Sequence, residues 1–359
     1  MPARSGVDQR HGDPHRRRRA HRGEHHVSLY IHAMGHFHPE VVITNKFLES
    51  LDIGTNDDWI VERVGIRERR SALPLEYLAA TKNRDVREAE SALLYTNADL
   101  AQRAAEMAMQ RAGVTREQIG LVISGSSAPR ILCPAEASFV AKQLGIEAPC
   151  WDVNSACSTF LMHLYNLSLM DPAKLPEFIL ITQTEQLTSA MDYSDRSSAV
   201  LFGDGAAAAV ISTKVPARVE ALWPAVASDP SGADKVLIRR TSVFSQDGRA
   251  VQMFAIKRTR EGYEKLKEQL AEEGGDRPLY FVGHQANLRV LEQVAQRCGV
   301  QPERHFSNVE WFGNTGGASC PTVISQHWDK VPAGADLAAV VVGGGLTWAR
   351  ALLRFGAAA

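Results

Sequence analysis

CWDVNSACSTFLMHLYNLSLM, residues 150–170, is the stretch that indicates the fold most directly. Residues 150–153 have the composition of an extended segment, and the apolar residues of 159–170 recur at helical spacing. A short strand therefore leads into an apolar helix, and Cys157 lies in the turn between them. A buried strand followed at once by a helix is typical of a layered α/β protein.

The same alternation continues on both sides of this stretch. In the part of the chain up to residue 214, we predict helices at 97–111 and 134–145 and strands at 121–124, 177–182 and 206–212. From residue 215 on, we predict helices at 261–273, 287–298 and 318–327 and strands at 279–282, 337–342 and 346–354. We therefore expect an α/β protein with a mainly parallel sheet, an N-terminal half at 27–214 and a C-terminal half at 215–359. The halves share an order of elements but no visible residue repeat.

Composition excludes several classes of function. The chain has 359 residues, 45% hydrophobic and 23% charged, which is enough to bury a large core. Its 40 Lys and Arg balance 41 Asp and Glu, so neither nucleic acid nor an anionic membrane is the expected partner. No apolar run approaches the roughly 18 residues of a membrane span. The 5 cysteines show no CxxC spacing, so we expect no metal site, no disulfide framework and a cytoplasmic location.

Residues 1–26 differ from the rest of the chain, because they contain five of the 12 histidines and the run RRRR at 16–19. Their polarity does not support a core, and no apolar segment of a secretory signal follows the charges. We expect an unstructured extension rather than a metal-binding or nucleic-acid-binding arm. We also expect the working protein to start near Val27, where strand-like alternation begins.

Three residues have the chemistry of a catalytic site. At a helix start, the dipole and free N–H groups favour a thiolate, so we expect a lowered pKa for Cys157, although a small buried hydrophobe is the simpler reading. His284 follows a predicted strand, and Asn314 lies in the glycine-rich turn GNTGG. Each residue alone would more often be structural. Together, a thiol nucleophile and two donors for an oxyanion suit thioester chemistry.

The segments around these residues carry a resemblance to a known family. Residues 152–157 (DVNSAC), 283–289 (GHQANLR) and 313–315 (GNT) resemble the three active-site segments of β-ketoacyl-acyl-carrier-protein synthase III, in the same order. Further similar strings are DWIVERVGIRER at 58–69, LFGDGA at 201–206 and GGGLTW at 343–348. A Cys-His-Asn set alone would also fit chalcone synthases, but the ending GGGLTW looks like synthase III. The resemblance covers roughly residues 27–356.

The resemblance implies a fold and a reaction. The fold would be a thiolase-like five-layered α/β/α/β/α arrangement of two similar halves, assembled as a homodimer. Cys157 would take a primer acyl group from acyl-coenzyme A, with the backbone N–H groups of Cys157 and Gly344 as the oxyanion hole. His284 and Asn314 would then hold the thioester of malonyl-acyl-carrier protein during decarboxylative Claisen condensation. No cofactor is implied beyond these substrates.

Binding residues are implied in the same way. Trp59, Arg63 and Arg196 match positions that bind coenzyme A, with Trp59 and Arg196 bracketing the adenine. Cys133, in ILCP at 131–134, matches a loop that crosses the dimer and closes the partner's acyl pocket, often with phenylalanine. Because cysteine is smaller, we expect a medium-length primer, since each buried methylene contributes about 0.8 kcal/mol. Arg289 and Arg297 match the helix that docks the acidic acyl carrier protein.

Three alternatives remain at this point. An acyltransferase of a secondary pathway would load Cys157 in the same way but pass the acyl group to another acceptor. The polar stretch at 71–97, longer than expected for the housekeeping enzyme, leaves the pathway open. A noncatalytic acyl-binding subunit is disfavoured because Cys157, His284 and Asn314 are all present. A metal-regulated or nucleic-acid-binding protein built around residues 1–26 is the most distant alternative.

Overall fold

The computed structural model describes residues 27–274 and 276–357, so the extension predicted for residues 1–26 lies outside the described residues. The strands are β1 (Leu29–Phe37), β2 (Val41–Thr44), β3 (Glu68–Ser71), β4 (Ile119–Gly125), β5 (Cys150–Asp152), β6 (Phe178–Gln186), β7 (Asp204–Ser212), β8 (Val219–Ser228), β9 (Val236–Arg239), β10 (Ser242–Gln246), β11 (Leu279–Gly283), β12 (Asp336–Gly343) and β13 (Thr347–Phe355). The helices are α1 (Asn45–Ser50), α2 (Asp57–Arg63), α3 (Leu75–Thr81), α4 (Ala89–Ala92), α5 (Asn97–Ala112), α6 (Glu136–Leu144), α7 (Thr159–Ser168), α8 (Arg196–Ala199), α9 (Gly248–Glu273), α10 (Leu288–Arg297), α11 (Val309–Phe312) and α12 (Ser319–Gln326).

Nine strands form one sheet in the order β11-β12-β13-β8-β1-β7-β6-β4-β5. Only β4 with β5, β4 with β6 and β11 with β12 pair in parallel, and the other neighbours are antiparallel. The prediction of a mainly parallel sheet is therefore wrong. The apolar runs marked the strands, but the direction of β7 and β13 depends on their return beside β6 and β12, which local composition does not record.

The strand order repeats between the two parts of the chain. The two parts meet in the middle of the sheet, where β1 lies beside β8. Outward from β1 come β7, β6, β4 and β5, and outward from β8 come their counterparts β13, β12 and β11, followed by a single parallel bridge between Phe281 and His305 in place of a fifth strand. Each part also carries its helices at matching places, because α5, α6 and α7 correspond to α9, α10 and α12. The duplicated architecture expected from the element order is present in the fold.

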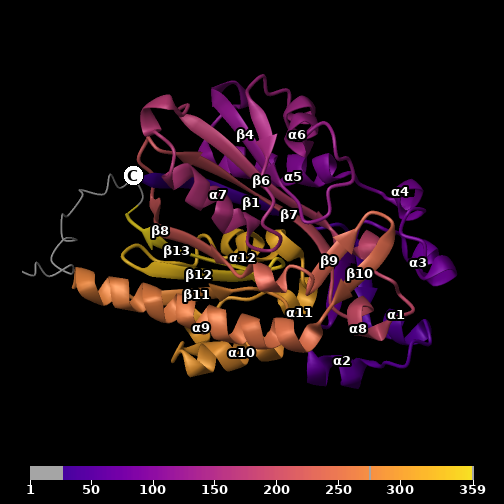
Figure 1. The fold of residues 1–359 in the computed structure, drawn as a ribbon. Coiled ribbons are helices and arrows are strands. Elements are labelled where there is room, and N and C mark those ends of the chain that lie inside the picture. The colour runs from indigo at the N-terminus through magenta and orange to yellow at the C-terminus, as the bar shows by residue number, and fades with distance from the viewer. Residues whose placement is uncertain (1–26, 275, 358–359) are drawn as a thin grey trace, which may run out of the picture.

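Five layers follow from the way the strands alternate their side chains (Figure 1). In β4, Val122 packs with the cluster of α5 and α6, whereas Leu121 and Ile123 pack with α7. In β12, alternate residues pack with α9 and with α12. Helices α7 and α12 thus form a central layer between the two parts of the sheet, with α5 and α6 outside one part and α9 and α10 outside the other. The thiolase-like arrangement is confirmed.

Several predicted element ends need correction. Helix α9 begins at Gly248 and not at 261, because the Asp247 side chain accepts a hydrogen bond from the Ala250 N–H and starts the helix earlier. Helix α6 begins at Glu136 and not at 134, since Asp152 accepts the N–H groups of Glu136 and Ala137 there. No helix in the described ranges has both the length and the apolar character needed to cross a membrane.

Candidate active site

Cys157 lies where β5 passes into α7, directly before the N-cap Ser158, as predicted. The turn is held by Thr159, whose Oγ1 accepts from the Ser155 N–H at 2.8 Å and donates to the Ala156 carbonyl at 2.7 Å. Ala156 has a φ of 48°, a strained value for a residue with a side chain. This sharp turn places Cys157 at the start of the central helix.

The Cys157 thiol does not have the lowered pKa that the helix position predicted. Burial raises its pKa to about 12, and the nearby Glu185 carboxyl raises it further. Desolvation therefore outweighs the backbone hydrogen bond that favours the thiolate at this position. At neutral pH the resting group is a thiol.

His284 directly follows β11. Burial lowers the pKa of its imidazole to about 4, so the ring is neutral at pH 7, and its Nδ1 has no hydrogen-bond partner. The adjacent Gln285 side chain fixes this loop, because its Nε2 donates to the Gly283 carbonyl and its Oε1 accepts from the Asn308 N–H. A neutral imidazole donates one hydrogen bond without carrying charge.

Asn314 is held by its own backbone and by its side chain. Its N–H donates to the Leu201 carbonyl at 2.8 Å, and its carbonyl accepts from the Gly203 N–H at 3.1 Å. Its Oδ1 accepts from the Gly316 N–H at 2.9 Å. Because the carboxamide oxygen is occupied, the NH₂ end is the group that the side chain can offer to a substrate.

The buried guanidinium side chain of Arg69 packs against the turn that carries Asn314. Arg69 is fully buried and donates from Nε to the Val200 carbonyl at 3.0 Å, and burial lowers its pKa to about 9. A Cβ at Gly313 would stand 2.8 Å from Cγ of Arg69, so only glycine lets the turn approach this side chain.

Cys157, His284, Asn314 and Gly344 line one cavity of about 200 Å³. The structure thus brings together four residues that lie far apart in the sequence. The rest of the wall is mostly apolar and comes from the β9–β10 hairpin, from the start of α9 and from the loops around them, with Leu187, Leu201, Phe202, Val236, Ile238, Phe244, Val251, Phe254 and Leu346 as its main apolar residues. Such a wall suits an aliphatic acyl or pantetheine chain.

The glycine turn between β12 and β13 lies against the cysteine. A Cβ at Gly343 would stand 3.0 Å from the Cys157 nitrogen and 2.9 Å from Oγ1 of Thr347, which is closer than side chains tolerate. A Cβ at Gly344 would meet only ordinary contacts at 3.4 Å and beyond. Glycine at 343 therefore permits the close approach of the second half of the chain to Cys157.

Trp59, Arg63 and Arg196 also come together. The guanidinium carbons of Arg63 and Arg196 lie 4.8 and 4.9 Å from the centre of the Trp59 ring, and Arg196 donates to the Gly54 carbonyl. A base inserted between Arg196 and Trp59 would need two contact distances of about 3.5 Å each. Arg196 must therefore move away from Trp59 before the two can bracket an adenine.

Other predicted residues lie away from the cavity. Cys133 is exposed and does not line the cavity of its own chain. Arg289 lies at the start of α10 near the cavity, where it donates to the Val61 carbonyl at 3.0 Å and pairs with Glu292. Arg297 is the last residue of α10, about 12 Å further along the helix. In the described part of the chain, no cluster of side chains could hold a metal ion.

Glu185 is a residue that sequence reasoning missed. It lies in β6, every residue of which is buried, and its charge acts on Cys157. Burial raises the pKa of its carboxyl to about 7. The signal in the sequence was a glutamate three residues after the run FILIT at 178–182, at a position where the strand continues and should be fully buried.

This duplicated five-layered fold, with a cysteine, a neutral histidine and an asparagine in one cavity, is that of a thiolase-like acyltransferase. Family models described as 3-oxoacyl-[acyl-carrier-protein (ACP)] synthase III and its C-terminal part match residues 151–229 and 278–355. The synthase III of Oceanobacillus iheyensis is 32% identical over 92% of this chain and 100% of that protein.

Solved structures agree with these sequence matches. The synthase III of Aquifex aeolicus superposes with a TM-score of 0.79 at 28% identity, over 91% of this chain and 100% of that one. The priming β-ketosynthase of the R1128 polyketide pathway gives 0.76 at 26%, over 92% and 97%. The chain belongs to the β-ketoacyl-acyl-carrier-protein synthase III family, and the resemblance seen in its sequence is confirmed.

Proposed function

We propose that this enzyme primes chain synthesis in two steps on Cys157. In the first, the sulfur attacks the thioester carbonyl of an acyl-coenzyme A, the acyl–Cys157 bond forms, and coenzyme A leaves with the thiol proton. In the second, malonyl-acyl-carrier protein loses carbon dioxide, its enolate attacks acyl-Cys157, and 3-oxoacyl-acyl-carrier protein forms while the cysteine regains a proton.

The observation that carries this proposal is the shared cavity of Cys157, His284 and Asn314. A neutral imidazole and an amide NH₂ can both donate to the malonyl thioester oxygen as negative charge develops there. Neither group needs to remove a proton, because loss of carbon dioxide itself generates the enolate. The low pKa of His284 favours this donor role over that of a base at pH 7.

The loading step needs donors for a second oxyanion, which we assign to the N–H groups of Cys157 and Gly344. The close packing of Gly343 against the Cys157 nitrogen supports this assignment, since it brings the two backbone segments together. Two N–H groups aimed at one oxygen form the usual oxyanion hole of acyl transfer. Coenzyme A would be held by Trp59, Arg63 and Arg196, and no cofactor takes part.

Arg289 and Arg297 are proposed to dock the acidic carrier protein. Arg289 supports this best, because it lies in the first turn of α10 beside Asn287 and Val290, which line the cavity. Arg289→Glu should raise KM for the malonyl carrier about tenfold and leave KM for acyl-coenzyme A unchanged. An equal rise in both constants would contradict docking at this residue.

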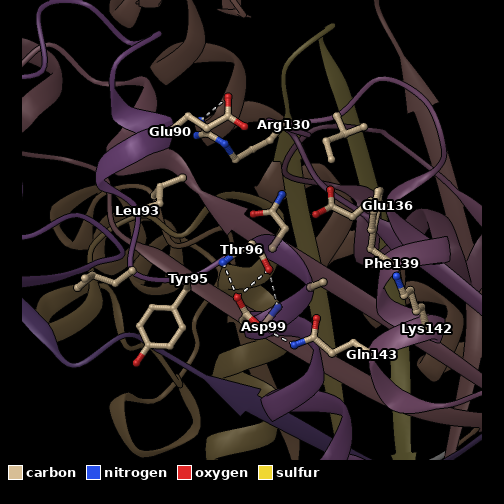
Figure 2. A pocket seen from close by; sticks show the side chains of 14 residues that line it. Glu90, Leu93, Tyr95, Thr96, Asp99, Arg130, Glu136, Phe139, Lys142 and Gln143 are labelled. Atoms are coloured by element: carbon tan, nitrogen blue, oxygen red, sulfur yellow. Dashed lines mark hydrogen bonds and ion pairs between the residues drawn. The ribbon is translucent and has the colours of Figure 1, made fainter.

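We propose that the homodimer forms through the edge strand β5. This strand ends the nine-stranded sheet, and Trp151 on it is 37% exposed. Beside it, Ile131, Leu132 and Leu94 are 45%, 76% and 53% exposed. Leu94 and Ile131 line a hollow of about 650 Å³ between α6 and the segment before α5, where Glu90 pairs with Arg130 (Figure 2). An open edge beside apolar side chains suits a second copy of the chain.

Within that dimer, Cys133 would approach the acyl pocket of the partner and leave room for a medium-length primer. The mostly apolar wall of the cavity supports an aliphatic primer. Turnover that is equal with acetyl and octanoyl primers would contradict this part of the proposal. A cytoplasmic location is also proposed, on the support of five cysteines that all remain free thiols.

Intact-mass analysis tests the reaction directly. Wild type and Cys157→Ala are incubated with acetyl-, octanoyl- or malonyl-coenzyme A, and malonyl-acyl-carrier protein is then added. We expect an acyl adduct on wild type alone, discharged as a 3-oxoacyl carrier with release of carbon dioxide. The absence of any adduct would overturn the proposal.

A specialised acyltransferase is the second candidate, favoured by the long segment that forms α3 and α4 between β3 and α5. The likeness to a polyketide priming synthase also fits such a pathway. An adduct that persists in the presence of malonyl carrier would favour this candidate, because the acyl group would then await a different acceptor.

A further inference from the structure

A buried carboxyl group joins two parts of the active site. Glu185 Oε1 accepts from the Ser127 Oγ at 2.7 Å, from the Gly317 N–H at 3.0 Å and from the Gln183 Nε2 at 3.0 Å. The Ser127 N–H also donates to it, at 3.1 Å to Oε2. One side chain thus binds the loop that leads to Cys133 and the turn that carries Asn314.

The contact with the Asn314 turn is unusually close. A Cβ at Gly316 would stand 3.0 Å from the Glu185 carboxyl carbon, and a Cβ at Gly317 would stand 3.0 Å from its Oε1. The two glycines therefore let the backbone lie against the carboxyl group. The Gly316 N–H donates to Asn314 Oδ1, and the next N–H along the chain, that of Gly317, donates to Glu185. The carboxyl group thus fixes the peptide directly after the one that orients the Asn314 amide.

We propose that Glu185 is a positioning residue for the condensation step, acting through Gly317 and Gly316 on the Asn314 amide. This proposal rests on the proposed function and adds a residue to it. The proposed loading step does not use the Asn314 amide, so it depends less on this turn. Loss of the Glu185 charge would lower the pKa of Cys157, which favours loading and does not impair it. The loading and condensation steps should therefore respond differently when Glu185 is changed.

Ionisation of Glu185 provides a second signature. Because burial raises its pKa to about 7, the group changes from acid to carboxylate between pH 6 and 8. The carboxylate accepts hydrogen bonds at both oxygens, whereas the acid must donate one. The titratable groups on which its charge acts are Glu136, whose pKa burial also raises to about 7, and Cys157, which carries the acyl group during condensation. Condensation by acyl-Cys157 should accordingly rise with pH through this interval, and the part of the rise that Glu185→Gln removes belongs to Glu185.

The test compares Glu185→Gln and Glu185→Asp with the matched variant Asp204→Asn. Asp204 is also a buried carboxyl that accepts backbone N–H groups, from Ala72 and Thr188, but no hydrogen bond joins its carboxyl group to the Asn314 turn. In Glu185→Gln we expect condensation to fall about tenfold or more, loading to change less than threefold, and the rise between pH 6 and 8 to disappear. Glu185→Asp should restore the pH dependence in part.

Hydrogen exchange gives a readout that does not depend on activity. The amides of residues 314–318 should exchange faster in Glu185→Gln than in wild type or Asp204→Asn. Unchanged exchange, or an equal loss of loading and condensation, would overturn the role of Glu185. If wild type itself releases no carbon dioxide, the proposed function fails, while the exchange result still decides whether Glu185 holds the turn.

Discussion

The state of the Cys157 thiol determines how the free enzyme reacts with electrophiles. Because its pKa is raised to about 12, the thiolate fraction should grow about tenfold with each pH unit between pH 7 and 9.5. We therefore expect the rate of iodoacetamide alkylation at Cys157, followed by peptide mass analysis, to rise throughout this interval. The exposed Cys133 in the same digest serves as the internal comparison. A plateau below pH 8 would indicate a thiolate stabilised by the helix.

Arg196 offers a second prediction at the scale of one residue. Once its guanidinium has moved away from the Trp59 ring, it would stack on the adenine of acyl-coenzyme A, and a cation–π contact is worth about 0.5 to 2 kcal/mol. Arg196→Ala should raise KM for acyl-coenzyme A about tenfold. A primer thioester of pantetheine, which lacks the nucleotide, should react with an unchanged KM. Equal effects on both primers would show that Arg196 does not bind the nucleotide.

The predicted residues that line the cavity all lie in recognisable local patterns, either directly after a strand or in a glycine-rich turn. Cys157 and His284 follow β5 and β11, which are the two end strands of the sheet, so their meeting was implied by the family resemblance and not by element order. Glu185 lies inside a strand, and its hydrogen bonds come from residues about 60 and 130 positions away. Such long-range partners leave no trace in local spacing.

At the scale of an element, the β12–β13 hairpin provides a matched pair of substitutions. Gly343→Ala should lower activity strongly, because its Cβ would stand 3.0 Å from the Cys157 nitrogen. Gly344→Ala should be much milder, since its Cβ meets ordinary contacts and the N–H proposed for the oxyanion hole is retained. Primer loading and thermal unfolding measured on both variants check this order. A larger loss in Gly344→Ala would contradict the packing argument.

Elements were predicted well where they are buried on both faces and less well where an element lines the cavity. Strand β12 was predicted within a residue at each end, since its apolar run is continuous. The first half of α9 was missed because Val251, Phe254 and Ala255 face the cavity instead of the sheet. The apolar residues in this half of the helix therefore line the cavity and do not show the regular spacing that packing against a sheet produces elsewhere.

At the scale of the whole molecule, the exposed apolar face beside β5 predicts self-association. Leu132→Asp should convert a dimer into a monomer, as measured by light scattering during size-exclusion chromatography. Leu169→Asp is the control, because Leu169 is 67% exposed at the end of α7 and is absent from this face. A wild-type monomer, or a dimer in both variants, would contradict the proposed interface.

The position of β13 affects how the protein folds while it is being synthesised. This strand contains residues 347–355 and yet lies inside the sheet, between β12 and β8. Until it is synthesised, β12 and β8 each lack a neighbour and present unpaired backbone groups. A chain that stops before residue 347 would have two such edges, which favours aggregation and recognition by chaperones. Truncation before this strand should therefore yield insoluble protein and not a partly active enzyme.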